Sequence, residues 1–530
     1  MRKPVIVGSR ASKLARWQAD YTIAKLKEAG FETELKLINT SGDKDRISRF
    51  SEMQGFGFFT GELEQALLSG EVDLAVHSFK DLPTTQAEGL VIAGCSYRAD
   101  PADVLLVKPG SRDATKLLDL KAGAVVGTSS VRRKNQILAL RPDLKVTDLR
   151  GNVPTRIQKL HDGQYDAIML AAAGIERLKP DLGELELVRL NPKTFVPAPA
   201  QGVLAYETRR GDQNALDAVA AIHDERAAMV VRAERKLLSN LNGGCHLPFG
   251  AYCEEIEGVC HFWISKATKQ DEFPLRLWIE NPDPDVLVVE AWQQLHKEKP
   301  SSVFISRVLD DDSIFLRAMH KHNIKIHAES LIDFTARTFK LNKADWLFFS
   351  SKTAVKMFVD FHPELSATLN NKTETSKIKL AAIGNGTAKE LLKAGFKADF
   401  IADPLDMNNS ILNFASLAQG THVVFPGAEN GLRTAQKIIE QSDKSITVED
   451  IIAYSNTSKK GIDIPQTDIV VLTSPLNVDT YFDAYPERMK SRFVAIGEST
   501  AKALQNRGAY KIFISRRPSE LALIECVFSS

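Results

Sequence analysis

Cys245 is the side chain in this sequence best placed by its neighbours for covalent chemistry. It lies in the run Asn-Gly-Gly-Cys-His-Leu-Pro at residues 242–248. Glycines before the thiol and a proline after it predict an irregular, approachable loop, where a sulfur can be alkylated. A small, buried and inert thiol is the alternative, because most intracellular cysteines are of that kind.

Arginines follow several of the predicted strands. They are Arg10, Arg132, Arg133, Arg150, Arg156 and Arg177. A guanidinium is permanently charged and its fork matches a carboxylate or phosphate. One such residue alone is usually a solvated surface arginine. Their repetition at strand ends, together with the thiol, favours covalent capture of a polyanionic substrate.

Two motifs at predicted strand ends carry more specific chemistry. Residues 128–133, Thr-Ser-Ser-Val-Arg-Arg, place hydroxyls at a helix start beside two guanidiniums, which predicts a carboxylate- or phosphate-binding site. Capping explains the hydroxyls but not the paired arginines.

Lys80 and Asp81 follow the strand 74–76, at the sheet edge where ligands of open α/β sheets bind. There a carboxylate can move a proton or stabilise a cation, with an exposed salt bridge as the alternative.

These residues need elements to position them, and the first two hundred residues alternate short apolar runs with amphipathic segments. This alternation predicts a doubly wound parallel sheet. The expected strands are 5–7, 74–76, 104–107, 125–126 and 168–170. Helices are expected around 63–67 and over 132–140, an irregular linker over 196–202, and a further helix over 217–240.

The second half begins a new α/β series at residue 303, after an expected connection over 282–300. Residues 348–355 resemble 471–478, and 383–389 resemble 496–502, which indicates a duplicated lobe with a cleft between its copies. The glycine-threonine junctions at 384–387 and 497–500 could bind carboxylates, although capping explains either one alone. Tyr454 could offer a phenol to the cleft, or be a core-edge aromatic.

Composition sets the remaining bounds. A chain of 530 residues predicts three to five domains of about 100–150 residues each. The net charge of +1 argues against a nucleic-acid binder that works by bulk charge. Five cysteines without a CxxC pair argue against a disulfide framework or a structural zinc site. No secretory signal and no run of ~18 apolar residues is found, so we expect a cytoplasmic protein without membrane or metal.

Residues 1 to about 280 closely resemble the hydroxymethylbilane synthase family, also called porphobilinogen deaminase. The matching stretches are Gly8-Ser-Arg-Ala-Ser-Lys-Leu-Ala15, His77-Ser-Phe-Lys-Asp81, Gly127-Thr-Ser-Ser-Val-Arg-Arg133, Arg150-Gly-Asn-Val-Pro-Thr-Arg156, Pro199-Ala-Gln-Gly202 and Gly243-Gly-Cys245. Residues from about 300 onward resemble uroporphyrinogen-III synthase, on the two Ile-Gly-x-x-Thr-Ala motifs and their serine-containing partners. The chain therefore resembles a fusion of consecutive enzymes of tetrapyrrole synthesis.

The resemblance implies an α/β fold of two periplasmic-binding-protein-like lobes and a small α+β domain, followed by a two-lobed α/β synthase module. The expected boundaries are 1–98 with 199–217 for deaminase domain 1, 99–198 for domain 2, 218–282 for the cofactor-carrying domain, 300–333 with 455–530 for synthase lobe 1, and 334–454 for synthase lobe 2.

The resemblance also implies residue roles in the first half. Cys245 would hold a dipyrromethane cofactor by a thioether, and Asp81 would assist the coupling of porphobilinogen units. The other residues expected to bind the cofactor are Lys80, Thr128, Ser129, Ser130, Arg132, Arg133, Arg150 and Gly151. Those expected to bind substrate are Arg10, Ser12, Arg150, Arg156, Arg177 and Gln201.

For the second half, the resemblance implies closure of the linear product, hydroxymethylbilane, with inversion of its last ring. That half would act by holding a flexible polycarboxylate in a productive shape. Tyr454 is the expected catalytic residue, and Thr387, Ser474 and Thr500 are expected to bind substrate.

Three departures from the family patterns stand out. Phe56 and Gly61 replace two lysines of the Gly-Lys-Gly-Leu-Phe-x-Lys-Glu-Leu-Glu stretch, the third domain is short, and Ser306-Arg307-Val308 stands where Thr-Arg-Pro is usual. A two-lobed protein that binds or senses anions without catalysis is the alternative function, but it needs no thiol at position 245. A nucleic-acid binder would need a basic surface and an aromatic stripe that the sequence does not display.

Overall fold

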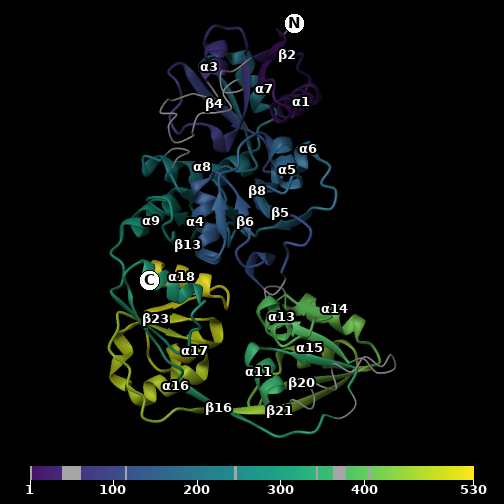
Figure 1. The fold of residues 1–530 in the computed structure, drawn as a ribbon. Coiled ribbons are helices and arrows are strands. Elements are labelled where there is room, and N and C mark those ends of the chain that lie inside the picture. Colours follow the sequence, from purple (N-terminus) through teal and green to yellow (C-terminus); the bar gives the residue numbers. More distant parts are fainter. Residues whose placement is uncertain are drawn as a thin grey trace.

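The computed structural model describes residues 3–38, 61–113, 116–243, 247–341, 344–361, 378–403 and 407–530. Within these ranges the strands form five sheets. Figure 1 shows two α/β units at the top, a smaller unit beside the second, and two further lobes at the base. The chain is thus a mixed α/β protein of several lobes, as the sequence predicts.

The first sheet carries the N-terminal motifs. Its strand order is β2-β1-β3-β10-β4. The strands are β1 (Val5–Arg10), β2 (Thr33–Ile38), β3 (Leu74–Ser78), β4 (Leu90–Cys95) and β10 (Leu204–Arg209). The helices of this unit are α1 (Lys13–Glu28), α3 (Gly61–Leu68) and α7 (Gln213–Ala220). The one-turn helix η1 (Phe79–Asp81) follows β3 directly.

The second sheet carries the paired arginines. Its order is β7-β6-β8-β5-β9. The strands are β5 (Asp103–Val107), β6 (Val125–Gly127), β7 (Lys145–Thr147), β8 (Ala167–Ala171) and β9 (Glu186–Arg189). The helices are η2 (Leu117–Asp119), α4 (Val131–Leu140), α5 (Val153–His161) and α6 (Ala172–Leu178).

Neither of these sheets is entirely parallel, which corrects one expectation. β10 runs antiparallel to β3 and β4, and β5 runs antiparallel to β8 and β9. The chain enters the second sheet at β5 and returns to the first at β10. Buried central strands are equally apolar in either direction, so hydrophobic pattern alone did not reveal their orientation.

A smaller unit has the antiparallel sheet β11-β12-β13, built from β11 (Phe249–Ile256), β12 (Val259–Lys266) and β13 (Leu275–Asn281). The helix expected over 217–240 is broken: α7 ends at Ala220 and α8 (Glu225–Asn240) begins after Asp224. The Asp224 carboxylate accepts a hydrogen bond from the Ala227 amide at 2.8 Å and caps α8. The stretch expected to connect the two halves contains helix α9 (Pro284–His296), which packs on α8 and β13.

A buried ion pair joins this smaller unit to the rest of the first half. Arg98 donates to Glu234 of α8 at 2.7 Å, and Glu234 also accepts from the amides of Ala200 and Cys253 at 2.7 and 2.8 Å. Glu234 is fully buried. Because a buried charge must be compensated, this carboxylate holds three segments of the chain in one arrangement.

One lobe of the second half has the sheet β15-β14-β22-β23-β24. Its strands are β14 (Ser302–Ile305), β15 (Lys325–Ala328), β22 (Ile469–Leu472), β23 (Arg492–Ala495) and β24 (Ile512–Ile514). Its helices are α10 (Ile314–Lys321), α16 (Pro475–Ala484), η3 (Pro486–Lys490), α17 (Glu498–Asn506) and α18 (Glu520–Ser529). The lobe therefore combines a segment near residue 300 with the end of the sequence.

The other lobe has the sheet β16-β21-β20-β17-β18-β19. Its strands are β16 (Ile332–Ala336), β17 (Trp346–Phe349), β18 (Lys379–Ile383), β19 (Phe400–Ala402), β20 (His422–Ala428) and β21 (Thr447–Ser458). Its helices are α11 (Lys352–Phe361), α13 (Gly384–Lys393), α14 (Met407–Leu417) and α15 (Thr434–Ser442). In Figure 1, β16 and β21 run between the two lobes at the base of the molecule.

The internal repeat corresponds to one repeated strand-helix pattern. β17 leads into α11 and β18 into α13, just as β22 leads into α16 and β23 into α17. No helix in the described part of the chain is both long and apolar enough to span a bilayer.

Candidate functional site

Charged side chains from the two upper lobes converge near η1. Lys80 and Asp81 lie on that turn of the first unit, and Lys80 is within electrostatic range of Asp103, Arg132 and Arg133 of the second. Desolvation by the surrounding protein lowers the pKa of the half-buried Lys80, while the Asp81 carboxylate opposes this shift. The structure therefore brings together the lysine, the aspartate and the paired arginines that the sequence singled out.

Asp103 is the counter-charge of the paired arginines, and sequence reasoning missed it. Its carboxylate accepts from Arg132 Nη1 at 2.8 Å and from Arg133 Nε and Nη2 at 3.0 and 2.7 Å. All three side chains are buried. Burial alone would raise the pKa of Asp103, but the two guanidiniums hold it below its ordinary value. The available signal was an aspartate opening an otherwise apolar strand, Asp-Val-Leu-Leu-Val.

The arginines also bond to backbone carbonyls, which fixes their orientation. Arg132 Nη1 donates to the Val196 carbonyl at 2.8 Å and Arg133 Nη1 to the Met169 carbonyl at 3.2 Å. Gln201 completes the network: its Nε2 donates to Asp103 at 3.0 Å and to the Pro101 carbonyl at 2.8 Å. Gln201 is buried, so in this structure it braces Asp103.

The predicted hydroxyls bond to backbone. Thr128 Oγ1 accepts from the Ser130 amide at 3.2 Å, and Ser130 is the N-cap of α4. Ser129 Oγ donates to the Leu149 carbonyl at 2.8 Å and ties β6 to the end of β7. Ser12 caps α1 by accepting from the Ala15 amide at 3.3 Å. Capping and bracing are thus the contacts that the structure shows for these hydroxyls.

The segment 150–156 places another arginine close to Asp81. Arg156 Nε donates to the Gly151 carbonyl at 2.7 Å. Burial and the positive charge of Arg133 lower the pKa of Arg156 to about 10, while Asp81 opposes the shift. Gly151 has φ of 113°, and an added Cβ would lie 2.8 Å from the Thr155 methyl, so glycine is required there.

Arg10, Arg150 and Arg177, the other predicted arginines, lie in different settings. Arg10 ends β1, and Arg150 precedes α5; both are half-buried. Arg177 lies in the last turn of α6, where Nη2 donates to the Gly202 carbonyl at 2.6 Å and the guanidinium lies over the Trp17 ring. Burial lowers the pKa of Arg177, and its electrostatic neighbours include tyrosines of the first unit. Arg177 thus bridges the two lobes at a place distinct from the Asp81 group.

Cys245 and Phe56 lie outside the described residues, whereas Gly61 is the first residue of α3. The described ends of the cysteine loop are the C-terminus of α8 and the start of β11. Gly243 is tightly packed there, since an added Cβ would lie 2.6 Å from a Leu238 methyl. Gly243, the last described residue before this loop, is therefore held closely against the end of α8.

Arg235 connects the same helix α8 to the turn η1 that carries Asp81. Its Nη1 donates to the carbonyls of Phe79 and Leu82 at 3.1 and 3.2 Å, and its Nη2 to the Pro83 carbonyl at 2.6 Å. The guanidinium also lies 4.5 Å from the centroid of the Phe79 ring. Sequence reasoning missed Arg235, because helical spacing does not show which distant carbonyls a side chain reaches.

In the second half, the predicted residues divide between the two lobes. Tyr454 on β21 is buried, and burial raises its pKa while Ser351 opposes the shift. Thr387 is buried near the start of α13 in the same lobe. Ser474 caps α16 and accepts from the Asn477 amide at 3.2 Å, while Thr500 is buried in α17. Thr387, Ser474 and Thr500 lie at strand-to-helix junctions of the two lobes, as the repeat predicts, whereas Tyr454 lies within β21.

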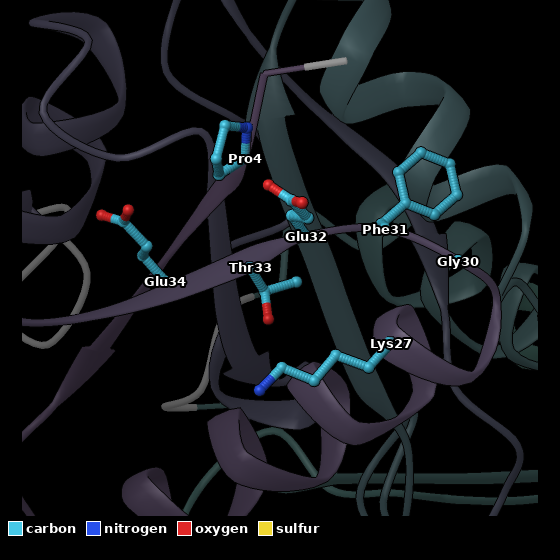
Figure 2. Close-up of a pocket in the computed structure, with 7 residues that line it drawn as sticks. All are labelled: Pro4, Lys27, Gly30, Phe31, Glu32, Thr33 and Glu34. Carbon is cyan, nitrogen blue, oxygen red and sulfur yellow. The ribbon is translucent and has the colours of Figure 1, made fainter. Parts of the chain in front are cut away.

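One surface depression lies elsewhere. It has a volume of about 460 Å³ between the end of α1 and β2, and Figure 2 shows its lining residues. Glu32 and Glu34 lie in its wall together with Lys27, so it carries no cationic excess. A polycarboxylate would be repelled by those glutamates, and none of the predicted site residues lines it.

Taken by geometry, the first half consists of two α/β lobes with a cationic group between them, completed by a small α+β unit. Such an arrangement defines an anion-binding α/β protein with a carboxylate, Asp81, among its cations. The second half is a separate pair of α/β lobes with polar side chains at matching junctions.

Comparison with known families specifies both halves. Residues 5–217 match the porphobilinogen deaminase dipyrromethane cofactor binding domain, and 228–276 match the porphobilinogen deaminase C-terminal domain. Residues 318–525 match uroporphyrinogen-III synthase HemD. The chain belongs to the porphobilinogen deaminase family in its first half and to the uroporphyrinogen-III synthase family in its second. It is a bifunctional enzyme of tetrapyrrole synthesis, and these matches do not favour a binding protein without catalysis.

Individual relatives agree with the first assignment. The porphobilinogen deaminase of Chlorobaculum parvum is 44% identical over 261 residues, which is 49% of this chain and 82% of that protein. That of Maridesulfovibrio salexigens is 46% identical over 256 residues, 48% of this chain and 81% of the relative.

A solved uroporphyrinogen-III synthetase of Helicobacter pylori is 20% identical, covers 42% of this chain and 96% of its own, and has a TM-score of 0.32.

Proposed function

We propose that the first half joins four porphobilinogen molecules into hydroxymethylbilane on a dipyrromethane attached to Cys245 by a thioether. The observation that supports this best is the meeting of Lys80 and Asp81 with Arg132, Arg133 and Arg156 across two lobes. Each pyrrole unit brings an acetate and a propionate, so a growing chain needs several fixed cations and one group that tolerates a cationic intermediate.

The residues present fit a dipyrromethane. When bound, this group supplies the primer to which pyrrole units are added. Lys80, Arg132 and Arg133 would hold its carboxylates, with Thr128, Ser129, Ser130, Arg150 and Gly151 beside it. Asp103 keeps both arginines charged and oriented, because its carboxylate is fully buried against them.

Asp81 is the proposed catalytic residue. It lies on the solvent-exposed side of η1, next to the ammonium of Lys80 and within electrostatic range of Arg156. A carboxylate there can stabilise the cationic pyrrole formed when ammonia leaves. Arg10, Ser12, Arg150, Arg156, Arg177 and Gln201 remain the proposed substrate-binding residues.

The second half is proposed to close hydroxymethylbilane to uroporphyrinogen III with inversion of the last ring. Tyr454 is the proposed catalytic residue, and Thr387, Ser474 and Thr500 would hold carboxylates from the two lobes. Orienting a flexible chain between two lobes can favour one ring closure over another without any metal ligand set. We further place the enzyme in the cytoplasm, without a nucleic-acid partner.

Two variants test the first activity. Cys245→Ser should abolish covalent loading of the cofactor, because serine offers no thiolate. Asp81→Ala should retain the cofactor, since the cations that hold it remain, but should lower the elongation rate by at least 100-fold. The readouts are the intact mass of each protein and the rate of porphobilinogen consumption. Normal turnover in either variant would refute its assignment.

The product isomer tests the second activity. With porphobilinogen as the only substrate, the full chain should release uroporphyrinogen III. Tyr454→Phe should shift the product toward isomer I, because free hydroxymethylbilane then closes without inversion. Tyr510→Phe is the matched control, since Tyr510 is 63% exposed. Isomer I alone from the unmodified chain would mean that the second half is not a cyclising synthase.

A further inference from the structure

Strand β13 presents two different faces. Its residues alternate, as in any strand, so Leu275, Leu277 and Ile279 point to one side and Arg276, Trp278 and Glu280 to the other. The first set packs in the core of the small unit with α8 and α9. The second set is aromatic and charged. By pattern alone this second face would be expected to lie in water.

The structure covers this face with the C-terminal helix of the synthase half. Arg276 donates to Glu525 of α18 through Nε at 3.1 Å and Nη2 at 2.7 Å. Its Nη1 also donates to the Thr194 carbonyl at 2.9 Å. Arg276 is 3% and Glu525 is 5% exposed, so this ion pair is out of reach of water. Removing one partner of such a pair leaves an uncompensated buried charge.

Three more contacts join the synthase to the same face. The guanidinium of Arg516 lies 4.0 Å from the centroid of the Trp278 ring and forms an ion pair with Glu280. Ser529 Oγ donates to the Trp278 carbonyl at 3.4 Å. All three outward residues of β13 thus have a synthase partner.

The apolar core continues across the boundary. Leu277 and Phe273 of the small unit belong to the same buried cluster as Leu523, Val527 and Phe528 of α18. Interfaces between mobile domains are usually more polar than this. The small unit and the synthase lobe therefore share one hydrophobic core.

The same lobe also touches the second deaminase sheet. Arg317 of α10 donates to the carbonyls of Ala139 and Leu140 at 3.0 and 3.4 Å, at the end of the helix α4 that carries Arg132 and Arg133. One synthase lobe thus bridges the arginine-bearing helix and the unit whose loop contains Cys245.

We propose that the lobe containing α10 and α18 is a structural partner of the deaminase half, docked on the outer face of β13 through Arg276 and Glu525. In this arrangement the small unit depends on α18 for its full stability, and loss of the contact lowers deaminase turnover. The curated relatives match only about half of this chain. The docking face is accordingly a feature of the fused protein.

A double-mutant cycle in the full chain tests this directly. The variants are Glu525→Gln, Arg276→Met and the double Arg276→Met/Glu525→Gln, with Glu487→Gln as the control on the same lobe, since the Glu487 side chain is 68% exposed. Hydrogen–deuterium exchange is measured at β13 and α18. Each single variant should raise exchange at least tenfold in both elements, the double variant should regain part of the protection, and the control should leave both unchanged.

Several results would overturn the proposal. Unchanged exchange in β13 when Glu525 is replaced would do so, as would strictly additive effects in the double variant. If Glu525→Gln does not fold, Arg516→Gln serves instead, because Arg516 is partly exposed; it should raise exchange around Trp278 severalfold, and no change there would equally refute the docking.

A second readout addresses turnover. Porphobilinogen consumption should fall at least threefold in Glu525→Gln and stay unchanged in Glu487→Gln. Equal rates would refute the link between docking and deaminase activity. The exchange measurement involves no catalysis, so its failure would leave the proposed function untouched.

Discussion

At the scale of single residues, one carboxylate governs the paired arginines. Asp103 accepts three hydrogen bonds from Arg132 and Arg133 and one from Gln201. Two buried guanidiniums without it would repel each other in a poorly solvated place. The orientation of both guanidiniums therefore depends on one buried anion.

Replacement of Asp103 by asparagine should destabilise the chain by about 3–5 kcal/mol, because two buried charges lose their partner. Urea denaturation of the chain, followed by a signal from the second lobe, gives the free energy of unfolding. Asp162→Asn is the control, since Asp162 is exposed at the end of α5. A loss below about 0.5 kcal/mol for Asp103→Asn, a typical surface value, would contradict the network.

At the scale of elements, helix α8 holds the turn that carries Asp81. Arg235 bonds to three carbonyls of the segment that surrounds Asp81, while α8 itself leads into the cysteine loop. Arg235 therefore ties the turn that carries Asp81 to helix α8. Arg235 is a positioning residue, since it acts through the turn.

Arg235→Lys should lower kcat at least tenfold with a smaller change in KM, because lysine cannot form the same fork of hydrogen bonds. Cofactor loading should persist, as read from the intact mass. Arg226→Gln on the same helix is the control, since the Arg226 side chain is 85% exposed. An unchanged kcat in Arg235→Lys would show that the turn is positioned by other contacts.

Sequence pattern predicted most elements around the site. Strand-end motifs such as 77–81 and 127–133 lie where apolar runs and caps indicated, because these signals are local. Strand direction in β5 and β10, the break before Asp224 and the helix α9 were not predicted. Each depends on packing between distant segments. The hydrogen-bond partners of Arg132 and Arg235 were missed for the same reason, because contacts between residues far apart in the sequence produce no periodic sequence pattern.

At the scale of the whole molecule, the two halves meet through a shared core. The face of β13 formed by Arg276, Trp278 and Glu280 has the sequence pattern of a solvent-facing strand face. Helix α18 nevertheless covers it. His322 of the synthase lobe lies at this boundary, 6.0 Å from the Phe273 ring and 4.9 Å from the Phe528 ring. Burial and Lys299 lower the pKa of His322 to about 4, while Glu272 opposes the shift.

This histidine makes the boundary sensitive to acid. Its pKa in the folded chain is below the unfolded value of about 6.5, so the unfolded chain binds more protons between these values. Stability should therefore fall by on the order of 2–3 kcal/mol as the pH drops from 6.5 to 4, and then level off. His322→Phe should remove this slope. The exposed His320→Gln on the same helix should retain it, and an unaltered slope in His322→Phe would contradict the assignment.

The intact mass of the purified, active full chain, followed by mapping of the modified residue, shows whether Cys245 carries the dipyrromethane. We expect one adduct of two linked pyrroles on Cys245 and none on Cys95, Cys253, Cys260 or Cys526, which are buried. A fully active protein whose Cys245 carries an unmodified thiol would contradict it.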